Sequence, residues 1–239
     1  MKLFEAVQAA LSNLQQAQDL QCVHRACAGL AAALDYQYFI YAFRALEQFN
    51  QPRVVYVIGY PPGWTERYFD RKYQNVDPVM LHCRQRLTPV VWADLVVSSP
   101  ESVAMMADAV AFGLTDGVTV PVHTPTGQMG VFSLAAARAS ADAPALSEVR
   151  CATLVMAPYI HEAIDRLAPS AGEALIQTLT EREAECLRWA ADGKTSWEIG
   201  QLLGVTERTA NHHLNNAVFK LGASNRQHAV AKAVVRGII

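Results

Sequence analysis

The stretch LTEREAECLRWAADGKTSWEIGQLLGVTERTANHHLNNAVFKLG, residues 179–222, carries the strongest secondary-structure signals in the chain. In and just after it, Ser or Thr stands three residues before Glu or Gln at three places: Thr180 and Glu183, Thr195 and Glu198, and Ser224 and Gln227. This spacing is typical of a capping box, in which the hydroxyl accepts from a backbone N–H and the acid or amide reaches back. Each match leads into an amphipathic run, so the sequence predicts a small all-helical domain.

Four helices are expected in this domain, over residues 181–191, 196–203, 207–221 and 225–236. The second and third are joined by Gly204, Val205 and Thr206, and a short connection with a glycine is typical of a helix-turn-helix. The third helix, which contains two adjacent histidines and three asparagines, is therefore the candidate recognition helix.

At helical spacing the third helix has two different faces. The apolar stripe, expected to pack on the domain core, consists of Ala210, Leu214, Ala217, Val218 and Leu221. The opposite face carries Arg208, His212, Asn215, Asn216 and Phe219. Arg and Asn are the side chains that pair with guanine and adenine edges in the major groove, although a merely solvated polar face has the same pattern. A metal site is not expected, because His212 and His213 point about 100° apart on one helix.

The segment from Leu179 onward resembles the DNA-binding domain of LuxR-type regulators. The matching residues are Glu183, Leu187, Gly193, Lys194, Thr195, Ile199, Thr206, Thr209, His213, Asn216, Lys220 and Leu221. The candidate residues for DNA contacts are Lys194, Thr195, Thr206, Arg208, Thr209, His212, Asn215, Asn216 and Lys220. Among them Arg208, Asn215 and Asn216 are candidates for base or backbone contacts near the groove, and Lys194 and Lys220 for phosphates. Ala210, His212 and Phe219 depart from the residues usual in that family, which affects the preferred operator rather than the fold.

Composition and charge narrow the possible functions of the chain. Among its 239 residues, 51% are hydrophobic, yet no uncharged apolar run reaches the roughly 18 residues of a membrane helix, and the N-terminus does not look like a signal peptide. Five cysteines without a CxxC pair argue against a disulfide framework or a zinc site and favour a reducing cytoplasm. Residues 1–174 have 12 Lys+Arg against 16 Asp+Glu, and residues 175–239 have 8 against 6, so only the C-terminal quarter is slightly basic.

The chain is expected to divide into domains at residues 1–167 and 175–239, joined by a linker at 168–174. The linker, APSAGEA, has a proline, a glycine and no periodicity, and it follows a helical pattern over 143–167. The first domain has an α+β pattern. Helical spacing covers roughly 3–17 and 20–34, strand alternation begins at Val54, and two strands at 117–123 and 128–137 are joined by a tight turn at 124–127.

Several polar and aromatic residues interrupt the apolar pattern of the first domain. Trp64 and Tyr68 share one face of a short helix, because they are four residues apart. Asp77 precedes a proline and therefore matches an ordinary helix N-cap. Ser133 is a hydroxyl in an apolar row and needs a partner, which its own neighbours can supply, and Trp92 can be plain core. From spacing alone, a structural role explains these residues as well as a binding role does.

The same residues resemble the pattern of LuxR-type autoinducer-binding domains. The residues of this chain that match the pattern, in the same order, are Tyr60, Trp64, Tyr68, Asp77, Pro78, Trp92 and Gly117. The resemblance implies an α/β/α sandwich around an antiparallel sheet, with an N-acyl-homoserine lactone between the sheet and one helical layer. It implies that Trp64 donates to the lactone carbonyl, that Asp77 accepts from the amide N–H, and that Tyr60 and Ser133 donate to the amide carbonyl. Tyr68 and Trp92 would line the head-group pocket. The acyl chain would contact Ile40, Ala42, Tyr56, Val79, Met80, Met129 and Val131, and Val79 replaces a residue that is polar in some receptors.

Together these features predict a two-domain regulator: an N-terminal α/β/α sandwich, and a C-terminal all-α domain of four helices with a helix-turn-helix. It would bind an acyl-homoserine lactone and, as a homodimer, inverted-repeat double-stranded DNA, with RNA polymerase as a further partner. The dimer would use a stripe of Ala229, Val230, Ala233 and Val234 on the fourth helix. No catalytic residues, cofactor or metal are expected. A LuxR-type regulator that senses a non-lactone molecule is the alternative, whereas a phosphorylated receiver and an enzyme both lack their motifs.

Overall fold

The protein is described by a computed structural model that covers residues 2–48, 51–124, 128–138, 143–167, 178–235 and 237–239. The chain separates into two compact units. The N-terminal unit is built from residues 1–123 and 129–170, and the C-terminal unit is built on residues 171–239. The predicted linker at 168–174 and most of the predicted turn at 124–127 lie outside the described residues.

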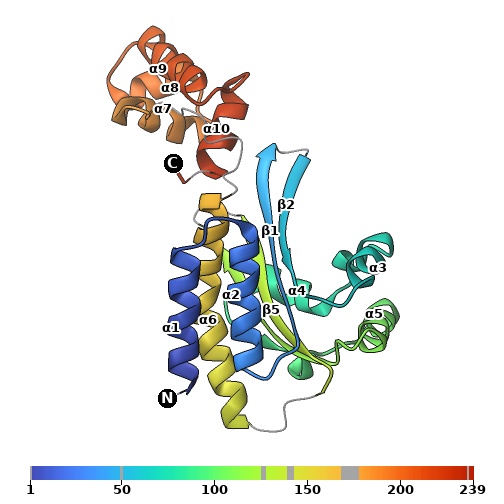
Figure 1. The fold of residues 1–239 in the computed structure, drawn as a ribbon. Helices are drawn as coiled ribbons and strands as arrows, with labels where there is room; N and C mark the ends of the chain where they lie inside the picture. The colour runs from blue at the N-terminus through green and yellow to red at the C-terminus, as the bar shows by residue number, and fades with distance from the viewer. Residues whose placement is uncertain (1, 49–50, 125–127, 139–142, 168–177, 236) are drawn as a thin grey trace. The chain divides into compact units, whose positions relative to one another are not determined.

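A five-stranded antiparallel sheet forms the middle of the N-terminal unit (Figure 1). The strands are β1 (Tyr38–Gln48), β2 (Gln51–Ile58), β3 (Val90–Val91), β4 (Asp116–His123) and β5 (Met129–Ala136), in the order β2-β1-β5-β4-β3. Residues of β4 and β5 are buried on both faces of the sheet, which explains why both strands have almost continuous apolar sequence.

One face of the sheet is covered by three helices, α1 (Lys2–Gln15), α2 (Leu20–Ala33) and α6 (Ala143–Leu167) (Figure 1). The core on this side holds the largest fully buried side chains, including Tyr41, Phe132, Met156 and Ile160. Within it the Tyr41 hydroxyl is 2.7 Å from Nδ1 of His161. This side of the sheet is filled with side chains.

The other face is covered by shorter elements: α3 (Trp64–Asp70), η1 (Tyr73–Asn75), α4 (Pro78–Gln85), η2 (Trp92–Asp94) and α5 (Pro100–Ala111) (Figure 1). A separate cluster of buried residues lies on this side, with Trp64, Tyr73, Met105 and Leu114 among its members. The predicted α/β/α sandwich around an antiparallel sheet is confirmed. Among the described residues, no helix combines the length and the apolar character that a membrane crossing needs.

The C-terminal unit contains the four predicted helices: α7 (Glu181–Ala191), α8 (Ser196–Leu203), α9 (Glu207–Lys220) and α10 (Arg226–Val235). The capping boxes of Thr180 with Glu183 and of Thr195 with Glu198 are both present. Between α8 and α9 the chain turns so tightly that a Cβ on Gly200 would lie 2.8 Å from the Val205 carbonyl oxygen, so the turn requires glycine there.

The third predicted capping box is wrong. The cap of α10 is Asn225, whose side-chain oxygen accepts from the His228 backbone N–H at 2.8 Å. Ser224 lies one residue earlier, and its hydroxyl is 3.0 Å from Nδ1 of His228. Asn and Ser are equally good caps, so the sequence SN offered two starting points and the spacing rule selected the wrong one.

Candidate functional site

The N-terminal unit contains a cavity of about 520 Å³ between the sheet and the layer of α3, α4 and α5. All thirteen residues that the sequence assigned to ligand binding line it: Ile40, Ala42, Tyr56, Tyr60, Trp64, Tyr68, Asp77, Val79, Met80, Trp92, Met129, Val131 and Ser133. Sequence reasoning missed other lining residues, among them Thr65, Gln74, Arg84, Met105 and Ala109. The spacing of Met105 and Ala109, four residues apart on one helix, was the only signal for any of these.

Strand pairing explains why residues distant in sequence meet at the cavity. In the antiparallel register, Ile40 lies opposite Ser133 and Ala42 lies opposite Val131. Side chains of directly opposite residues share one face of a sheet, and every second residue returns to that face. The floor of the cavity is therefore a patch of alternate residues from β1 and β5.

Asp77 is both a helix cap and a cavity residue. Its Oδ1 accepts from the backbone N–H of Val79 at 2.8 Å and of Met80 at 3.4 Å, which confirms the predicted N-cap of α4. Its Oδ2 accepts from the Tyr68 hydroxyl at 2.8 Å, which leaves acceptor capacity on this oxygen. The residue is only 8% exposed. Burial raises the pKa of Asp77 above its ordinary value, although hydrogen bonds from Tyr68 and from the backbone, and the charge of Arg84, oppose the rise.

Trp64 begins α3 and is buried among aromatic rings. Its ring centroid lies 5.8 Å from that of Tyr68, 6.1 Å from that of Tyr73 and 5.4 Å from that of Phe112. These contacts fix the plane of the indole. Within the described part of the chain no hydrogen bond joins its N–H to another residue, so the donor is available at the cavity wall.

Trp92 differs from Trp64, because its indole N–H is already used. It donates to the Thr119 hydroxyl oxygen at 2.9 Å, and that oxygen lies 2.8 Å from the Ser133 hydroxyl. A Cβ on Gly117 would lie 2.7 Å from the Trp92 ring, so glycine is required beside the indole. Trp92 therefore forms cavity wall with its ring and orients the two hydroxyls.

Tyr60 completes the polar part of the cavity. Burial raises the pKa of its phenol well above the ordinary value, and a hydrogen bond from Ser133 opposes this rise. The phenol is therefore neutral at physiological pH and keeps an O–H to donate. Asp77, Trp64 and Tyr60 thus offer one acceptor and two donors in an otherwise mainly apolar cavity.

A polar cluster ties together the elements that cover the cavity. Asp108 of α5 accepts from Nε of Arg67 on α3 at 2.8 Å and from the hydroxyl of Tyr73 in η1 at 2.6 Å. The hydrogen bond from Arg67, followed by that from Tyr73, lowers the pKa of Asp108 to about 2. Helix α3, which carries Trp64, and η1, which precedes Asp77, are therefore both joined to α5 at one carboxylate.

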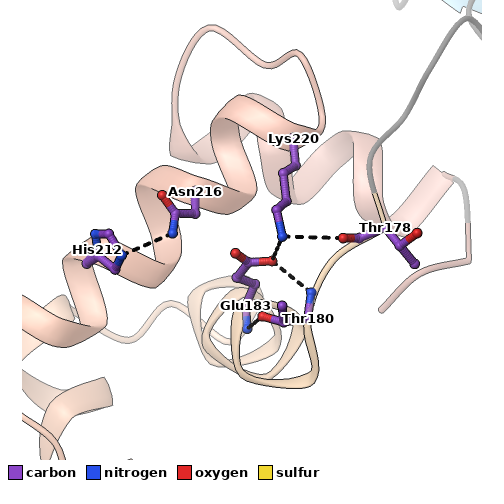
Figure 2. A network of polar contacts seen from close by, with 6 residues as sticks. All are labelled: Thr178, Thr180, Glu183, His212, Asn216 and Lys220. Carbon is purple, nitrogen blue, oxygen red and sulfur yellow. Dashed lines mark hydrogen bonds and ion pairs between the residues drawn. The ribbon is translucent and has the colours of Figure 1, made fainter.

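In the C-terminal unit, α9 has the two faces that the sequence predicts. Ala210, Leu214 and Ala217 are buried in the core of the unit. Arg208, His212, Asn215 and Phe219 are exposed, and Asn216, half-buried, lies with its side-chain nitrogen 3.2 Å from Nε2 of His212 (Figure 2). Thr206 caps α9 by accepting from the Thr209 backbone N–H, while Lys194 and Thr195 precede α8.

Lys220 has a partner inside its own unit. Its ammonium donates to Oε2 of Glu183 at 2.7 Å and to the Thr178 carbonyl oxygen at 3.4 Å, as Figure 2 shows. Glu183 is only 3% exposed, and the same oxygen accepts from the Thr180 backbone N–H at 2.7 Å. Burial raises the pKa of Glu183, but the hydrogen bonds from Lys220 and Thr180 outweigh it, so the pKa is lowered. The predicted contact of Lys220 with a DNA phosphate stays a prediction, and this ion pair argues against it.

The α10 stripe that the sequence assigned to a dimer interface is used differently. Ala229 and Ala233 are fully buried in the core of the C-terminal unit. Val230 is half-buried, and Val234 is 53% exposed. Small residues suit close packing against another copy and close packing within a unit equally well, and the sequence contains no sign of which applies.

Comparisons with known proteins agree with this arrangement. Residues 19–164 match the family model of the autoinducer binding domain, and residues 177–233 match that of the bacterial regulatory proteins of the luxR family. The chain is 35% identical over 213 residues to the transcriptional activator protein AhyR of Aeromonas hydrophila, covering 86% of this chain and 81% of AhyR.

Solved structures show the same likeness. A crystal structure of Escherichia coli SdiA is similar with a TM-score of 0.77 and 26% identity, covering 99% of this chain and 98% of SdiA. SdiA in complex with octanoyl-rac-glycerol gives a TM-score of 0.73 and 25% identity, covering 97% of this chain and 94% of that one. The chain therefore belongs to the LuxR family of transcriptional regulators, with an autoinducer-binding domain followed by a helix-turn-helix DNA-binding domain.

Proposed function

We propose that the chain binds an N-acyl-homoserine lactone in the N-terminal cavity and, in response, regulates promoters in quorum sensing. The observation that carries the proposal is Asp77, a buried carboxylate that no ion pair joins to a cation in the described part of the chain. A buried charge is unfavourable unless donors meet it. An amide N–H from a ligand is such a donor, and Oδ2 has acceptor capacity left for it.

The remaining polar groups suit the rest of that ligand. The unpaired indole N–H of Trp64 is a donor for the lactone carbonyl, and the Tyr60 and Ser133 hydroxyls are donors for the amide carbonyl. The apolar walls, including Ile40 and Val131, suit the acyl chain. A cavity of about 520 Å³ with a few fixed polar groups is typical of small-molecule sites. No cofactor is needed for this function.

A thermal-shift panel tests the ligand assignment. It compares N-acyl-homoserine lactones of several chain lengths with their ring-opened acyl-homoserines and with a monoacylglycerol. At about 100 times its dissociation constant, a ligand is expected to stabilise the fold by about 2.7 kcal/mol. Stabilisation by lactones but not by ring-opened forms supports the proposal, whereas no shift with any lactone refutes it.

A non-lactone ligand is the second candidate, because SdiA was solved in complex with octanoyl-rac-glycerol. A glycerol ester has hydroxyl donors for Asp77 and an ester carbonyl for Trp64, but it has no amide. Stabilisation by the monoacylglycerol alone would select this alternative. Mass spectrometry of whatever co-purifies with the full chain is an independent readout.

For the C-terminal unit we propose that a homodimer reads inverted-repeat DNA in the cytoplasm and contacts RNA polymerase there. The exposed face of α9 offers Arg208, Asn215 and Asn216 for bases, while Thr206 and Thr209 at its start and Lys194 and Thr195 before α8 lie where phosphates bind helix N-termini. Two copies related by a two-fold axis would place their recognition helices about one turn of DNA apart. His212 and Lys220 remain candidates for further contacts.

Selection from random DNA tests the second proposal. We expect a palindrome, and we expect the Asn215→Ala variant to prefer a different sequence. Recovery of no palindrome, or of an unchanged palindrome after Arg208, Asn215 and Asn216 are all replaced by alanine, would refute it. Size measurement of the chain with and without ligand tests the dimer separately.

A further inference from the structure

A chain of hydrogen bonds joins the starts of α8 and α10 to α9 in the C-terminal unit. The Ser196 hydroxyl, at the first residue of α8, donates to Oδ1 of Asn211 on α9 at 2.6 Å. Arg226, the first residue of α10, donates from Nη1 to the Ser196 hydroxyl oxygen at 3.4 Å and from Nη2 to the Lys194 carbonyl oxygen. The hydroxyl that contacts α9 is therefore itself held by the fourth helix of the unit.

The chemistry of Arg226 gives this chain of hydrogen bonds one direction. A guanidinium has donors and no acceptor, so the Ser196 oxygen accepts from it. The single hydrogen of the Ser196 hydroxyl is then left for Asn211, and the atom that receives it has to be an acceptor. The Asn211 amide is therefore held with Oδ1, rather than Nδ2, toward α8.

Asn211 belongs to the exposed face of α9 that also carries Arg208 and Asn215. Around the helix axis it lies about 60° from Arg208 and about 40° from Asn215, because the two residues are three and four positions away. Within the described part of the chain, no hydrogen bond uses Nδ2 of Asn211. Two N–H donors are thus left on the face that the proposed function assigns to base contacts.

We propose that Asn211 reads guanine in the major groove through the N–H groups of Nδ2, and that Ser196 and Arg226 impose this choice by engaging its oxygen. This proposal rests on the proposed DNA-binding function. Guanine presents two acceptors, N7 and O6, side by side. Adenine presents N7 beside an amino donor, so asparagine pairs fully with adenine only when Oδ1 accepts from that amino group. Because Ser196 takes Oδ1, guanine is favoured over adenine.

The test compares the sequences that the full chain and its variants select from random double-stranded DNA, with and without the lactones of the thermal-shift panel. We expect a wild-type site with a guanine in each half-site at which Asn211→Ala loses its preference. At that position Ser196→Ala, which releases Oδ1, is expected to shift the preference about tenfold toward adenine. Ser196→Thr keeps a hydroxyl and is expected to keep the guanine.

Arg226→Met tests the outer part of the hydrogen-bond chain. Without the guanidinium, the Ser196 hydroxyl is free to accept from Asn211 instead of donating to it, so guanine and adenine are expected to be selected about equally. Gln227→Met, at the next and exposed residue of α10, is the matched control and is expected to leave the preference unchanged. If Arg226→Met does not fold, the two Ser196 variants decide.

Base preference is the readout that separates a positioning role from a merely structural one. Loss of stability in the C-terminal unit lowers the amount of folded protein and weakens binding to every sequence alike. A change of the preferred base at one position requires that the groups facing that base have changed. Thermal melting of each variant, measured beside the selection, reports the structural part on its own.

The possible outcomes separate this proposal from the proposed function. Recovery of no preferred site by the wild-type chain under either condition refutes the DNA-binding function and this proposal with it. The proposal alone is overturned by a site that Asn211→Ala leaves unchanged, by a base other than guanine at the affected position, or by a guanine preference that survives in Ser196→Ala. Loss of the guanine preference in Asn211→Ala, its shift toward adenine in Ser196→Ala and its retention in Ser196→Thr establish the proposal.

Discussion

Two buried carboxylates near helix N-termini, Asp77 and Glu183, have pKa values shifted in opposite directions. Burial raises the pKa of each, but Glu183 accepts from the ammonium of Lys220 and its pKa falls. Asp77 accepts only from neutral donors, and the charge of Arg84, which forms no ion pair with it, does not offset the burial, so its pKa stays raised. A carboxylate paired with a cation of its own chain is part of the fold. A buried carboxylate that no cation contacts directly, such as Asp77, keeps acceptor capacity that a ligand in the cavity can use.

Loss of the cation from the Glu183 pair is expected to have the largest effect. Lys220→Met leaves a buried carboxylate unpaired, which destabilises a protein by about 3 kcal/mol. Urea unfolding of the full chain, followed by hydrogen exchange in α7 and α9, measures the loss. Glu183→Gln in the same chain is expected to recover part of it, because the unpaired charge is gone.

Lys194→Met is the control for this variant, since no ion pair involving Lys194 occurs in the described residues. It is expected to leave unfolding unchanged. If Lys220→Met also left unfolding unchanged but made DNA binding less sensitive to salt, Lys220 would be a phosphate contact after all.

Removal of the charge from Asp77 is expected to affect the ligand rather than the fold. Asp77→Asn keeps a good N-cap for α4 but weakens the acceptor for the ligand amide. We expect ligand affinity to fall by roughly 1.5–3 kcal/mol and the ligand-free chain to be no less stable. Calorimetry and thermal melting measure the two effects, with the exposed Asp94→Asn as the control. Equal ligand affinity in wild type and Asp77→Asn would mean that Asp77 is only a cap.

Lowering the pH is expected to change the stability of the two units in opposite directions, through Asp77 in the N-terminal unit and Glu183 in the C-terminal unit. Because the pKa of Asp77 is raised on folding, its contribution to stability is complete below the unfolded value of about 3.9 and is lost as the pH rises through the folded pKa. Because the pKa of Glu183 is lowered on folding, its contribution is complete above the unfolded value of about 4.3 and is lost as the pH falls through the folded pKa.

Hydrogen-exchange protection of α4 and α7, corrected for the intrinsic rate at each pH between about 6 and 3, tests this contrast. The change of protection with pH in α4 should disappear in the Asp77→Asn variant, and the change of protection with pH in α7 should disappear in the Glu183→Gln variant. Parallel responses of the two units that persist in both variants would contradict the comparison.

The smallest expected effect concerns the cluster of Arg67, Tyr73 and Asp108 over the cavity. This ion pair is partly exposed, so it contributes little to stability, but it joins α3 and η1 to α5. We expect Asp108→Asn to speed ligand dissociation about threefold while the melting temperature barely changes. Stopped-flow displacement measures the rate, and Asp70→Asn on the exposed side of α3 is the control. An unchanged rate would show that the cluster does not hold the ligand in.

The sequence predicted the C-terminal unit from local rules alone, because caps and helical spacing depend on residues three or four apart. Two of the three predicted caps are confirmed, and the third failed where Ser224 and Asn225 competed for one position. The sandwich was predicted from resemblance, since alternation in short strands does not reveal their order in a sheet. The cap formed by Asp77 followed from its spacing to Pro78.

The hydrogen-bond partners of the buried polar side chains were not predictable from the sequence, because the two members of each pair are distant along the chain. Glu183 and Lys220 are 37 residues apart, and Trp92 and Thr119 are 27 apart. Each pair meets only after helices pack or strands adopt a register. The orientation of the Asn211 amide was likewise not predictable, because its partner Ser196 is 15 residues away.

The hydrogen bond donated by Trp92 determines how the hydroxyl groups of Thr119 and Ser133 are oriented in the cavity. An indole can only donate, so the Thr119 oxygen is already occupied as an acceptor, and the arrangement that uses every hydrogen has Thr119 donating to Ser133. The Ser133 hydrogen is then left to donate to a ligand in the cavity. Trp92 thus sets the orientation of a hydroxyl two hydrogen bonds away, before any ligand arrives.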